Sequence, residues 1–245
     1  MKSIRTIIVL MLMAMVWLSG KSQGTVVYEY PAMLSLEKPW DVSVYGGLGY
    51  QSPLGKLHDN FGGAMMFQVG VTAGYKRLRG KLEVAYSQPS LRNKNIFNVP
   101  DSIGLDGNRF PKQGNSNASA THLLGNFQLG YTVWRNEKLE ITPNAGVHYN
   151  SYRWDVENYS WSKADSEVYT RHILNAERRT LTSWSWIASV DVDLKLSTHT
   201  TLGDVSSKSS WLRFTAWVSG SNFTKCDPSV KGCNIGLTAN YMFRM

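Results

Sequence analysis

Residues 184–196 read WSWIASVDVDLKL, and this stretch decides the fold. Beginning with Trp184, every second residue is apolar, whereas the residues between them are mostly hydroxylated or charged. Successive side chains of a β-strand point to opposite faces of the sheet, so the alternation predicts a strand with one apolar face and one polar face. All three charges of the stretch, on Asp191, Asp193 and Lys195, fall on the polar face.

The same alternation recurs along the chain and predicts eight strands in all. The predicted strands cover residues 41–50, 65–75, 81–87, 122–133, 139–149, 184–196, 212–218 and 235–243. Their apolar faces carry no charge at the strand centres, and aromatic residues such as Tyr50, Tyr75 and Tyr149 lie near the strand ends. A soluble barrel or sandwich, which is the alternative, would carry Lys and Glu on its outward face. The pattern predicts an all-β fold, namely a transmembrane up-and-down antiparallel β-barrel of eight strands, apolar outside and polar inside.

Length and composition exclude several other classes of protein. The chain has 245 residues, 42% of them hydrophobic, which is ample for a folded core. No run of about 18 apolar residues follows the N-terminal region, and this excludes a helical multi-span membrane protein. The net charge of +8 is spread along the sequence without a basic tract, so nucleic acid is not an expected partner.

The N-terminal region has the layout of a secretory signal. Lys2 and Arg5 precede an apolar run that begins at Ile7 and ends at Leu18, and small residues follow this run. An uncleaved anchor helix is the alternative, although the run is short for a membrane crossing. We predict a signal peptide over residues 1–22, a periplasmic lead-in over 23–40 and an outer-membrane β-barrel over 41–245.

The connections between the predicted strands alternate in length. Residues 76–80 and 135–138 form tight turns, whereas residues 89–120 and 150–181 form long loops. Outer-membrane barrels have short periplasmic turns and longer surface loops. The alternation therefore predicts that the long loops lie at the cell surface and that both termini lie in the periplasm.

The arrangement resembles the small eight-stranded outer-membrane barrels of the OmpA/OmpX type. The resemblance lies in strands rich in glycine and aromatic residues, from Val44 to Tyr50 and from Gly236 to Phe243, and it covers about residues 41–243. It implies a location in the outer membrane of a Gram-negative bacterium. It also implies outer-membrane lipid, lipopolysaccharide and the barrel-assembly machinery as partners.

In barrels of this type the last strand ends with an aromatic residue that the insertion machinery reads. The resemblance therefore points to Tyr241 and Phe243 as the insertion signal. Here Arg244 and Met245 follow the aromatic residue, which departs from the strict form of that signal.

The polar faces of the predicted strands hold charged residues that would lie inside the barrel. They are Glu83, Glu140, Asp191, Asp193, Lys195 and Arg213. Strand order places Glu140 near Lys195, and Asp193 near Arg213. Because buried charges must be paired, and because eight strands enclose an interior that side chains just fill, we predict a paired polar network. A gated ion path or a catalytic carboxylate pair is the alternative.

Two histidines, His122 and His148, also point inward near the surface ends of neighbouring predicted strands. Ser119, Ser151 and Asp155 fall in the loops above them. A lipid-modifying enzyme would need a histidine with such a partner, but the spacing matches no known catalytic motif. A metal pair would need a third ligand, and none is evident. We predict hydrogen-bonded histidines in the interior network, no catalytic residue, no bound metal and no cofactor.

Cys226 and Cys233 flank a short segment of the last predicted surface loop. In an oxidising compartment two nearby cysteines form a disulfide, which we predict here. A reactive or metal-binding pair is the alternative.

The long loops combine aromatic residues with arginines. They include Phe97, Phe110, Trp154, Tyr159, Trp161, Tyr169, Arg171, Arg178 and Arg179. This composition suits a binding surface, and it equally suits the lipid head-group region. We expect a structural or surface-interaction role in which the loops contact an extracellular ligand or protein partner. A porin-like narrow channel for small solutes and a lipid-modifying enzyme are the alternatives.

Overall fold

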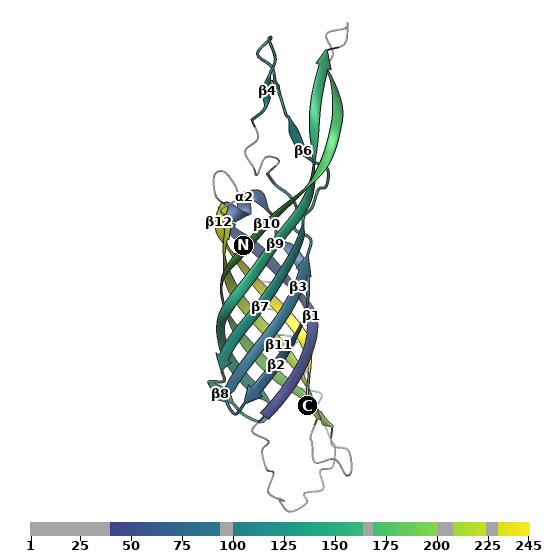
Figure 1. Ribbon diagram of the computed structural model, residues 1–245. Coiled ribbons are helices and arrows are strands. Elements are labelled where there is room, and N and C mark those ends of the chain that lie inside the picture. The colour runs from purple at the N-terminus through teal and green to yellow at the C-terminus, as the bar shows by residue number, and fades with distance from the viewer. Residues whose placement is uncertain (1–39, 94–99, 164–168, 200–207, 224–229) are drawn as a thin grey trace, which may run out of the picture. The chain divides into compact units, whose positions relative to one another are not determined.

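The computed structural model describes residues 40–93, 100–163, 169–199, 208–223 and 230–245. Its long strands are β1 Trp40–Gly55, β2 Ala64–Tyr75, β3 Leu78–Ser87, β7 Thr121–Tyr131, β9 Leu139–Lys163, β10 Tyr169–His199, β11 Lys208–Phe223 and β12 Val230–Arg244. Each long strand pairs antiparallel with the next, and β12 pairs back with β1 from Arg244 opposite Ser43 to Gly232 opposite Gly55. The strands form a closed ring (Figure 1), and the predicted eight-stranded antiparallel barrel is confirmed.

Short elements accompany the ring. They are α2 Lys56–Asn60, β4 Ser102–Ile103, β5 Arg109–Phe110, β6 Gln113–Asn115 and β8 Trp134–Arg135. Both β6 and β8 pair with β9, and β4 pairs with β5. Within the described ranges, no helix has the length and apolar character that a membrane crossing requires. The predicted signal peptide (1–22) and the predicted lead-in (23–40), apart from Trp40, lie outside the described residues and stay predictions.

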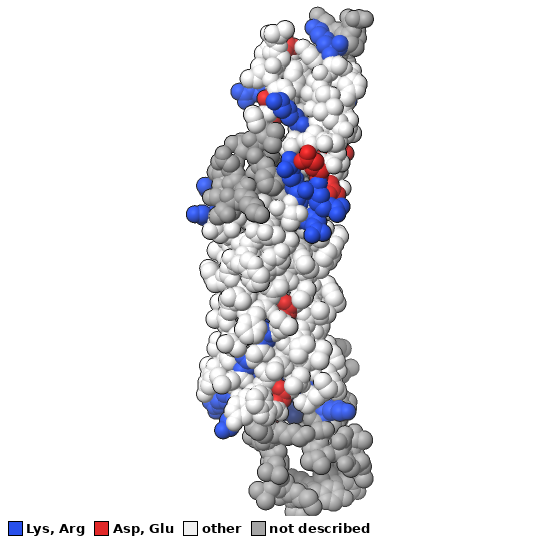
Figure 2. Space-filling view, viewed as in Figure 1, with Lys and Arg blue, Asp and Glu red and all other residues white. Residues whose placement is uncertain are grey.

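The outer wall of the barrel is apolar. On β2 the outward Met65, Phe67 and Val69 are 64%, 53% and 46% exposed, whereas the inward Gln68 is fully buried. The other strands alternate in the same way, and Figure 2 shows the middle of the wall largely without charged groups. Apolar side chains on this scale are stable when they face hydrocarbon rather than water. The outward direction of the apolar faces, which the sequence predicted, is confirmed.

Aromatic side chains mark both edges of this apolar band. Near the tight turns, the rings of Trp40 and Tyr75 lie 4.5 Å apart between centroids, and near the other edge those of Tyr149 and Trp184 lie 5.0 Å apart. On β1 the band extends over about ten residues, from Trp40 to Tyr50, which gives a height of about 25 Å for a strand tilted by about 40°. That height equals the apolar band of an outer-membrane barrel.

The turn between β2 and β3 is shorter than the sequence predicted. It consists of Lys76 and Arg77 alone, and Lys76 has a φ of 55°, in the left-handed region that two-residue hairpin turns require. A tight turn lies where the sequence predicts one, but residues 78–80 belong to β3. The charge of Arg79 is typical of a solvated turn, which is why the sequence extends the predicted turn too far. In the structure Arg79 points into the barrel and is 4% exposed.

Residues 150–181, predicted as a long loop, form instead the upper part of the β9–β10 hairpin. The two strands pair as far as Lys163 opposite Tyr169, with a β-bulge between Ile173 and Asn175. The pairing of β9 with β7 ends at Arg153, so the hairpin rises above the ring (Figure 1). A hairpin outside the membrane has no lipid-facing side, and its sequence therefore lacks the apolar alternation that revealed the other strands.

Leu82, at the middle of the lipid-facing side of β3, allows a test of the membrane orientation. Leu82→Arg should lower the free energy of unfolding by about 2–4 kcal/mol, because the guanidinium would face hydrocarbon. Leu78 lies beside the turn, at the edge of the apolar band. The matched control Leu78→Arg should therefore lower the free energy of unfolding by only about 0–1 kcal/mol. Denaturant unfolding in lipid vesicles measures both values. Equal costs at the two positions would contradict the orientation.

Candidate functional site

A carboxylate shared among three arginines fills the end of the barrel near the tight turns. Glu140 on β9 accepts two guanidinium hydrogen bonds from Arg244 on β12, each of 2.9 Å. The same carboxylate lies 3.0 Å from Arg135 and 3.6 Å from Arg79, and Arg79 also pairs with Asp41 at 2.8 Å. This cluster connects five strands across the ring and neutralises a buried carboxylate.

Lys195 is not among the partners that the described structure gives Glu140. It is half-buried, and its Nζ lies 5.9 Å from the centroid of the Trp211 ring. The arginines that take its place were missed because two of them lie next to turns and the third follows the last apolar residue of β12. In a sequence, arginines at such positions are expected to face solvent. Only the closure of the ring brings these three side chains to the carboxylate of Glu140.

Two aspartates and two cations form a second layer further along the barrel axis. Asp193 accepts hydrogen bonds from Nε and Nη2 of Arg213 at 2.7 and 2.8 Å. Asp191 lies 3.1 Å from the ammonium of Lys81 and accepts a bond from the Thr215 hydroxyl at 2.7 Å. The four charged side chains are at most 3% exposed. The structure thus brings Asp193 and Arg213 together, and the layer carries no uncompensated charge.

Glu83 is held by neutral groups rather than by a cation. Its carboxylate accepts a hydrogen bond from the Tyr45 hydroxyl at 3.0 Å and another from the Asn126 amide at 2.7 Å. Arg213 lies over the Tyr45 ring, 4.9 Å from its centroid. Glu83 is therefore satisfied by hydrogen bonds and connects the charged layer to the amide-rich layer that follows.

The two inward histidines are embedded in an amide-rich network. Nδ1 of His122 lies 2.6 Å from the Gln51 amide nitrogen, and its Nε2 lies 2.8 Å from Oδ1 of Asn150. Nδ1 of His148 is hydrogen-bonded to Oδ1 of Asn126. Both rings are completely buried. Each histidine therefore contacts uncharged hydrogen-bonding groups.

The serine and acid residues above the histidines contact other groups. Asp155 pairs with Arg178 at 2.9 Å on the hairpin, and Ser119 forms a β-bridge with Ser90. Within the part of the chain that the structure describes, no three His, Cys, Asp or Glu side chains are grouped to hold a metal ion. The surroundings of the two rings are thus those of a hydrogen-bonded interior.

An apolar cluster closes the surface end of the barrel. Its buried members are Leu57, Phe61, Ala120, Tyr152, Trp154, Val156, Leu181, Phe223 and Val230. Phe61 stacks on Tyr152 with 4.1 Å between ring centroids, and Tyr152 stacks on His122 at 3.8 Å. Gly55, with a φ of 66°, turns the chain into α2, so that Leu57 reaches this cluster. Trp154, expected as an exposed loop aromatic, is 3% exposed and belongs to the cluster.

A second aromatic cluster braces the far end of the hairpin. Phe110 of β5 lies 5.2 Å from Trp161 and 4.5 Å from Tyr169 between ring centroids. The Trp161 indole donates to the carbonyl of Pro111 at 2.9 Å, and the Tyr169 hydroxyl donates to Asp106 at 2.8 Å. The β4–β5 segment is therefore fastened to β9 and β10 by side chains from both strands.

The hydrogen bond at this tip changes the acidity of both partners. The hydroxyl of Tyr169 lowers the pKa of the Asp106 carboxyl from its ordinary value, and the carboxylate raises the pKa of Tyr169. The bond therefore favours the docked tip at a pH where Asp106 is ionised, and this contribution is lost as the pH falls through the lowered pKa of Asp106.

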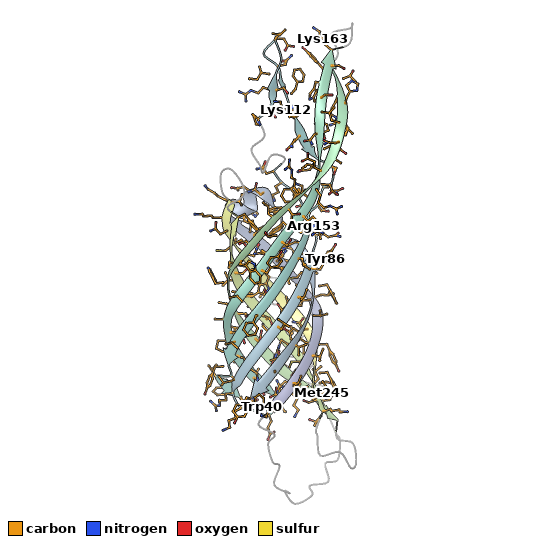
Figure 3. All side chains as sticks on the ribbon, viewed as in Figure 1. Trp40, Tyr86, Lys112, Arg153, Lys163 and Met245 are labelled. Atoms are coloured by element: carbon orange, nitrogen blue, oxygen red, sulfur yellow. The ribbon has the colours of Figure 1, made fainter. Side chains whose placement is uncertain are left out.

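Cations gather where the hairpin leaves the ring. Arg153 is exposed on β9, and Figure 3 places it above Tyr86 along the barrel wall. Arg178 pairs with Asp155, and Arg179 pairs with Glu177 at 2.8 Å. Figure 2 shows a mixed cluster of charges just above the uncharged wall.

The predicted disulfide cannot be placed, because Cys226 lies outside the described residues. Cys233 lies on β12 and is half-buried, and no disulfide occurs among the described residues. The pairing stays a prediction. Tyr241 and Phe243 lie on the outward face of β12, where the Tyr241 hydroxyl donates to Ser210 at 2.7 Å, and their role as an insertion signal also stays a prediction.

No family model and no curated protein sequence matches the chain. Among solved structures, the chain is similar to Ail, the attachment invasion locus protein of Yersinia pestis, with 10% identity, a TM-score of 0.41 and coverage of 84% of this chain and 99% of Ail. The chain is also similar to OprG of Pseudomonas aeruginosa, with 9% identity, a TM-score of 0.44 and coverage of 84% of this chain and 95% of OprG. A third similar structure is Neisserial surface protein A, with 11% identity, a TM-score of 0.33 and coverage of 83% of this chain and 96% of that protein. At these values the similarities carry no inference about binding or activity.

The barrel itself defines the class. A closed antiparallel ring with an apolar outer wall, aromatic edges and a polar interior is an outer-membrane β-barrel. The chain is a small eight-stranded barrel of this kind, and its location is the outer membrane. The expected OmpA/OmpX-type architecture is thereby confirmed.

Arg213 provides a test of the filled interior. Arg213→Ala should lower the free energy of unfolding by about 3–5 kcal/mol, because it removes the bidentate cation of the buried Asp193 and leaves only Arg244, 3.7 Å away, beside it. Denaturant unfolding in lipid vesicles measures the loss, and the double variant Arg213→Ala with Asp193→Ala should recover part of it. Unchanged stability together with a new conductance in planar bilayers would contradict the filling role.

The contact between Tyr169 and Asp106 can be tested by titration. Tyr169→Phe should raise the pKa of Asp106 towards the ordinary aspartate value, because the hydroxyl that stabilises the carboxylate is gone. Carboxyl carbon NMR of the protein in lipid nanodiscs measures this pKa. Tyr159→Phe is the control, since the Tyr159 hydroxyl donates to Glu157 and should leave Asp106 unchanged. An Asp106 titration that is identical in Tyr169→Phe and the native protein would rule out this contact.

Proposed function

We propose that this protein is a surface-interaction protein in which the β9–β10 hairpin binds an extracellular protein partner or ligand, and in which the barrel is its membrane support. The observation that carries this proposal is the hairpin itself. It continues both strands above the ring to Lys163 opposite Tyr169, and the β4–β5 segment braces it. A braced extension beyond the membrane presents a preorganised surface to the outside, which lowers the entropy lost on binding.

The outer edge of the hairpin offers backbone groups to a partner. Among the described residues, the backbone of β10 between Tyr169 and Thr182 pairs with β9 alone. Side chains of Ser183 and Ser185 already hydrogen-bond to β11, and backbone pairing with β11 begins at Ile187. A strand edge that is free on one side can accept an extended chain through main-chain hydrogen bonds. Ile173 and Leu174 are 56% and 66% exposed beside this edge and add apolar contact area. An extended peptide segment is the partner that fits these features.

The filled interior supports a barrel that serves as a scaffold rather than as a channel. The ion pairs of Glu140, the layer of Asp191 and Asp193, the histidine network and the apolar cluster at the mouth follow one another along the barrel. Buried side chains from different strands meet in each of these layers. The uncharged partners of His122 and His148 support hydrogen-bonding roles rather than catalytic ones.

The lipid surroundings provide the remaining proposed partners. Arg153 and Arg178 lie above the aromatic edge formed by Tyr149 and Trp184, a position that suits the phosphates of lipopolysaccharide. We also propose the barrel-assembly machinery as the partner during insertion, with Tyr241 and Phe243 facing outward on the closing strand.

The hairpin's role can be tested with a peptide library. The protein in lipid nanodiscs is screened with phage-displayed random dodecapeptides. A truncated variant, in which residues 156–177 are replaced by Asn-Gly between Asp155 and Arg178, is the comparison. We expect peptides with alternating β-branched residues that bind the native protein and lose at least tenfold in affinity for the truncated barrel. Heat-modifiable migration on gels checks that the truncated barrel is folded.

Two proline variants sharpen this test. Successive residues of an edge strand direct their N–H groups alternately inward and outward, so one of Ala176→Pro and Glu177→Pro removes an outward donor and the other an inward one. The variant that removes the outward donor should lose peptide binding while the hairpin stays paired. Peptide binding that survives truncation, or a steady conductance of the native protein in planar bilayers, would contradict the proposed function.

A further inference from the structure

A row of outward side chains crosses four neighbouring strands where the apolar wall ends at the tight turns. Trp40 on β1 pairs with Tyr75 on β2, and Tyr75 pairs with Leu78 on β3. Leu78 in turn pairs with Tyr131 on β7, and all four side chains are between 38% and 65% exposed. Figure 3 places Trp40 at this end of the barrel. Tyrosine and tryptophan gather where hydrocarbon meets the lipid head groups, so the row marks the head-group level of one leaflet.

Two cations lie directly beyond this row. Lys76 and Arg77 form the turn that joins Tyr75 to Leu78, and both side chains are exposed. The ammonium of Lys76 lies over the Tyr75 ring, 5.5 Å from its centroid, which keeps this charge beside the outer wall. Among the described residues, no carboxylate forms an ion pair with Lys76 or Arg77. Their two charges are therefore available to an anion outside the protein.

The turn between β7 and β9 adds to this positive charge. The N–H of Thr132 donates to the carbonyl of Arg77 at 2.8 Å, which holds the two turns side by side. This second turn carries the cations Arg135 and Lys138 against one acid, Glu137, and all three side chains are exposed. The two turns together thus carry a net positive charge, which attracts anions over a distance of about 8–10 Å at physiological ionic strength.

Charges at the opposite edge of the wall are paired within the protein. Arg178 pairs with Asp155 at 2.9 Å, and Arg179 pairs with Glu177 at 2.8 Å. Figure 2 shows Lys and Arg mixed with Asp and Glu at that edge, whereas Lys and Arg predominate where the wall ends at the tight turns. The excess of positive charge at the tight turns is therefore a local feature of this end of the barrel.

The wall next to these cations leaves room for a hydrocarbon chain. Ala73 on β2 and Gly80 on β3 are paired and face outward, two residues further into the apolar band than Tyr75 and Leu78. Apart from its chain neighbours, no atom comes closer than 3.9 Å to the position that a Cβ on Gly80 would take. Leu129, which pairs with Gly80 from the other side, is 62% exposed. A soluble anion would leave this apolar surface unused, whereas the acyl chain of a lipid lies along it.

We propose that this end of the barrel binds an anionic phospholipid, with the head group at Lys76 and Arg77 and an acyl chain along the wall beside Gly80. The phosphate accepts hydrogen bonds from the Arg77 guanidinium and the Lys76 ammonium. The predicted orientation of the barrel makes this the periplasmic leaflet, where glycerophospholipids rather than lipopolysaccharide are found. The site lies at the end of the barrel away from the hairpin and does not depend on the proposed peptide binding.

Native mass spectrometry of the protein released from detergent micelles measures lipid binding. The protein is titrated with dioleoyl phosphatidylglycerol or with dioleoyl phosphatidylcholine, which have identical acyl chains and differ in head group. We expect the native protein to bind phosphatidylglycerol more tightly by a factor of about 5 or more. The double variant Lys76→Gln with Arg77→Gln should weaken phosphatidylglycerol binding by about fivefold for each cation removed, and leave phosphatidylcholine binding unchanged.

The double variant Lys163→Gln with Arg171→Gln is the matched control. It removes the same charge from the far end of the hairpin, and these two cations also lie over tyrosine rings. Phosphatidylglycerol binding should be the same in this control as in the native protein. Heat-modifiable migration on gels shows that both double variants are folded.

Several results would overturn the site. Equal affinities of the native protein for the two lipids would remove the preference for an anionic head group. Equal weakening by the two double variants would reduce the preference to net charge. Displacement of the lipid by soluble glycerophosphoglycerol would show a site for soluble anions, such as acidic protein segments. Lipid A binding that falls as much as phosphatidylglycerol binding in Lys76→Gln with Arg77→Gln would overturn the assignment to phospholipid.

Discussion

Hydrocarbon offers no hydrogen-bond partner, so every backbone N–H and C=O group inside the membrane must be paired within the protein. The continuous pairing of β12 with β1 meets this requirement, because it leaves the ring without an edge. Closure also determines what the interior can be. Eight strands enclose a space that side chains just fill, so each inward residue must find its partner among the others.

The interior meets this demand by alternating kinds of contact along the axis. Arginines surround Glu140 at one end, paired ions follow around Asp191, and neutral amides hold His122 before aromatic rings close the mouth. Each layer joins residues that are far apart in the sequence. The same layers that fill the lumen therefore hold the strands in register, which couples the interior chemistry to the stability of the wall.

The sequence predicts those parts of the fold in which the membrane requires one side of every strand to be apolar. Strand number, the outward face and the proximity of Asp193 to Arg213 follow from period-2 alternation and strand order alone. The partners of Glu140 do not, because Arg79, Arg135 and Arg244 converge only once the ring has closed. The sequence likewise predicts a loop in place of the upper hairpin, and an exposed position for Trp154, because outside the bilayer no lipid-facing side imposes an alternating pattern.

The hairpin has a mechanical consequence. Because β9 runs from the wall of the barrel into the hairpin as one strand, with no described break between Leu139 and Lys163, the extension has no joint at its base. The segment from Arg153 to Lys163 adds about 30 Å of reach at about 3.3 Å per residue. A strand that is continuous over that length transmits a force applied near Lys163 along β9 to the wall of the barrel.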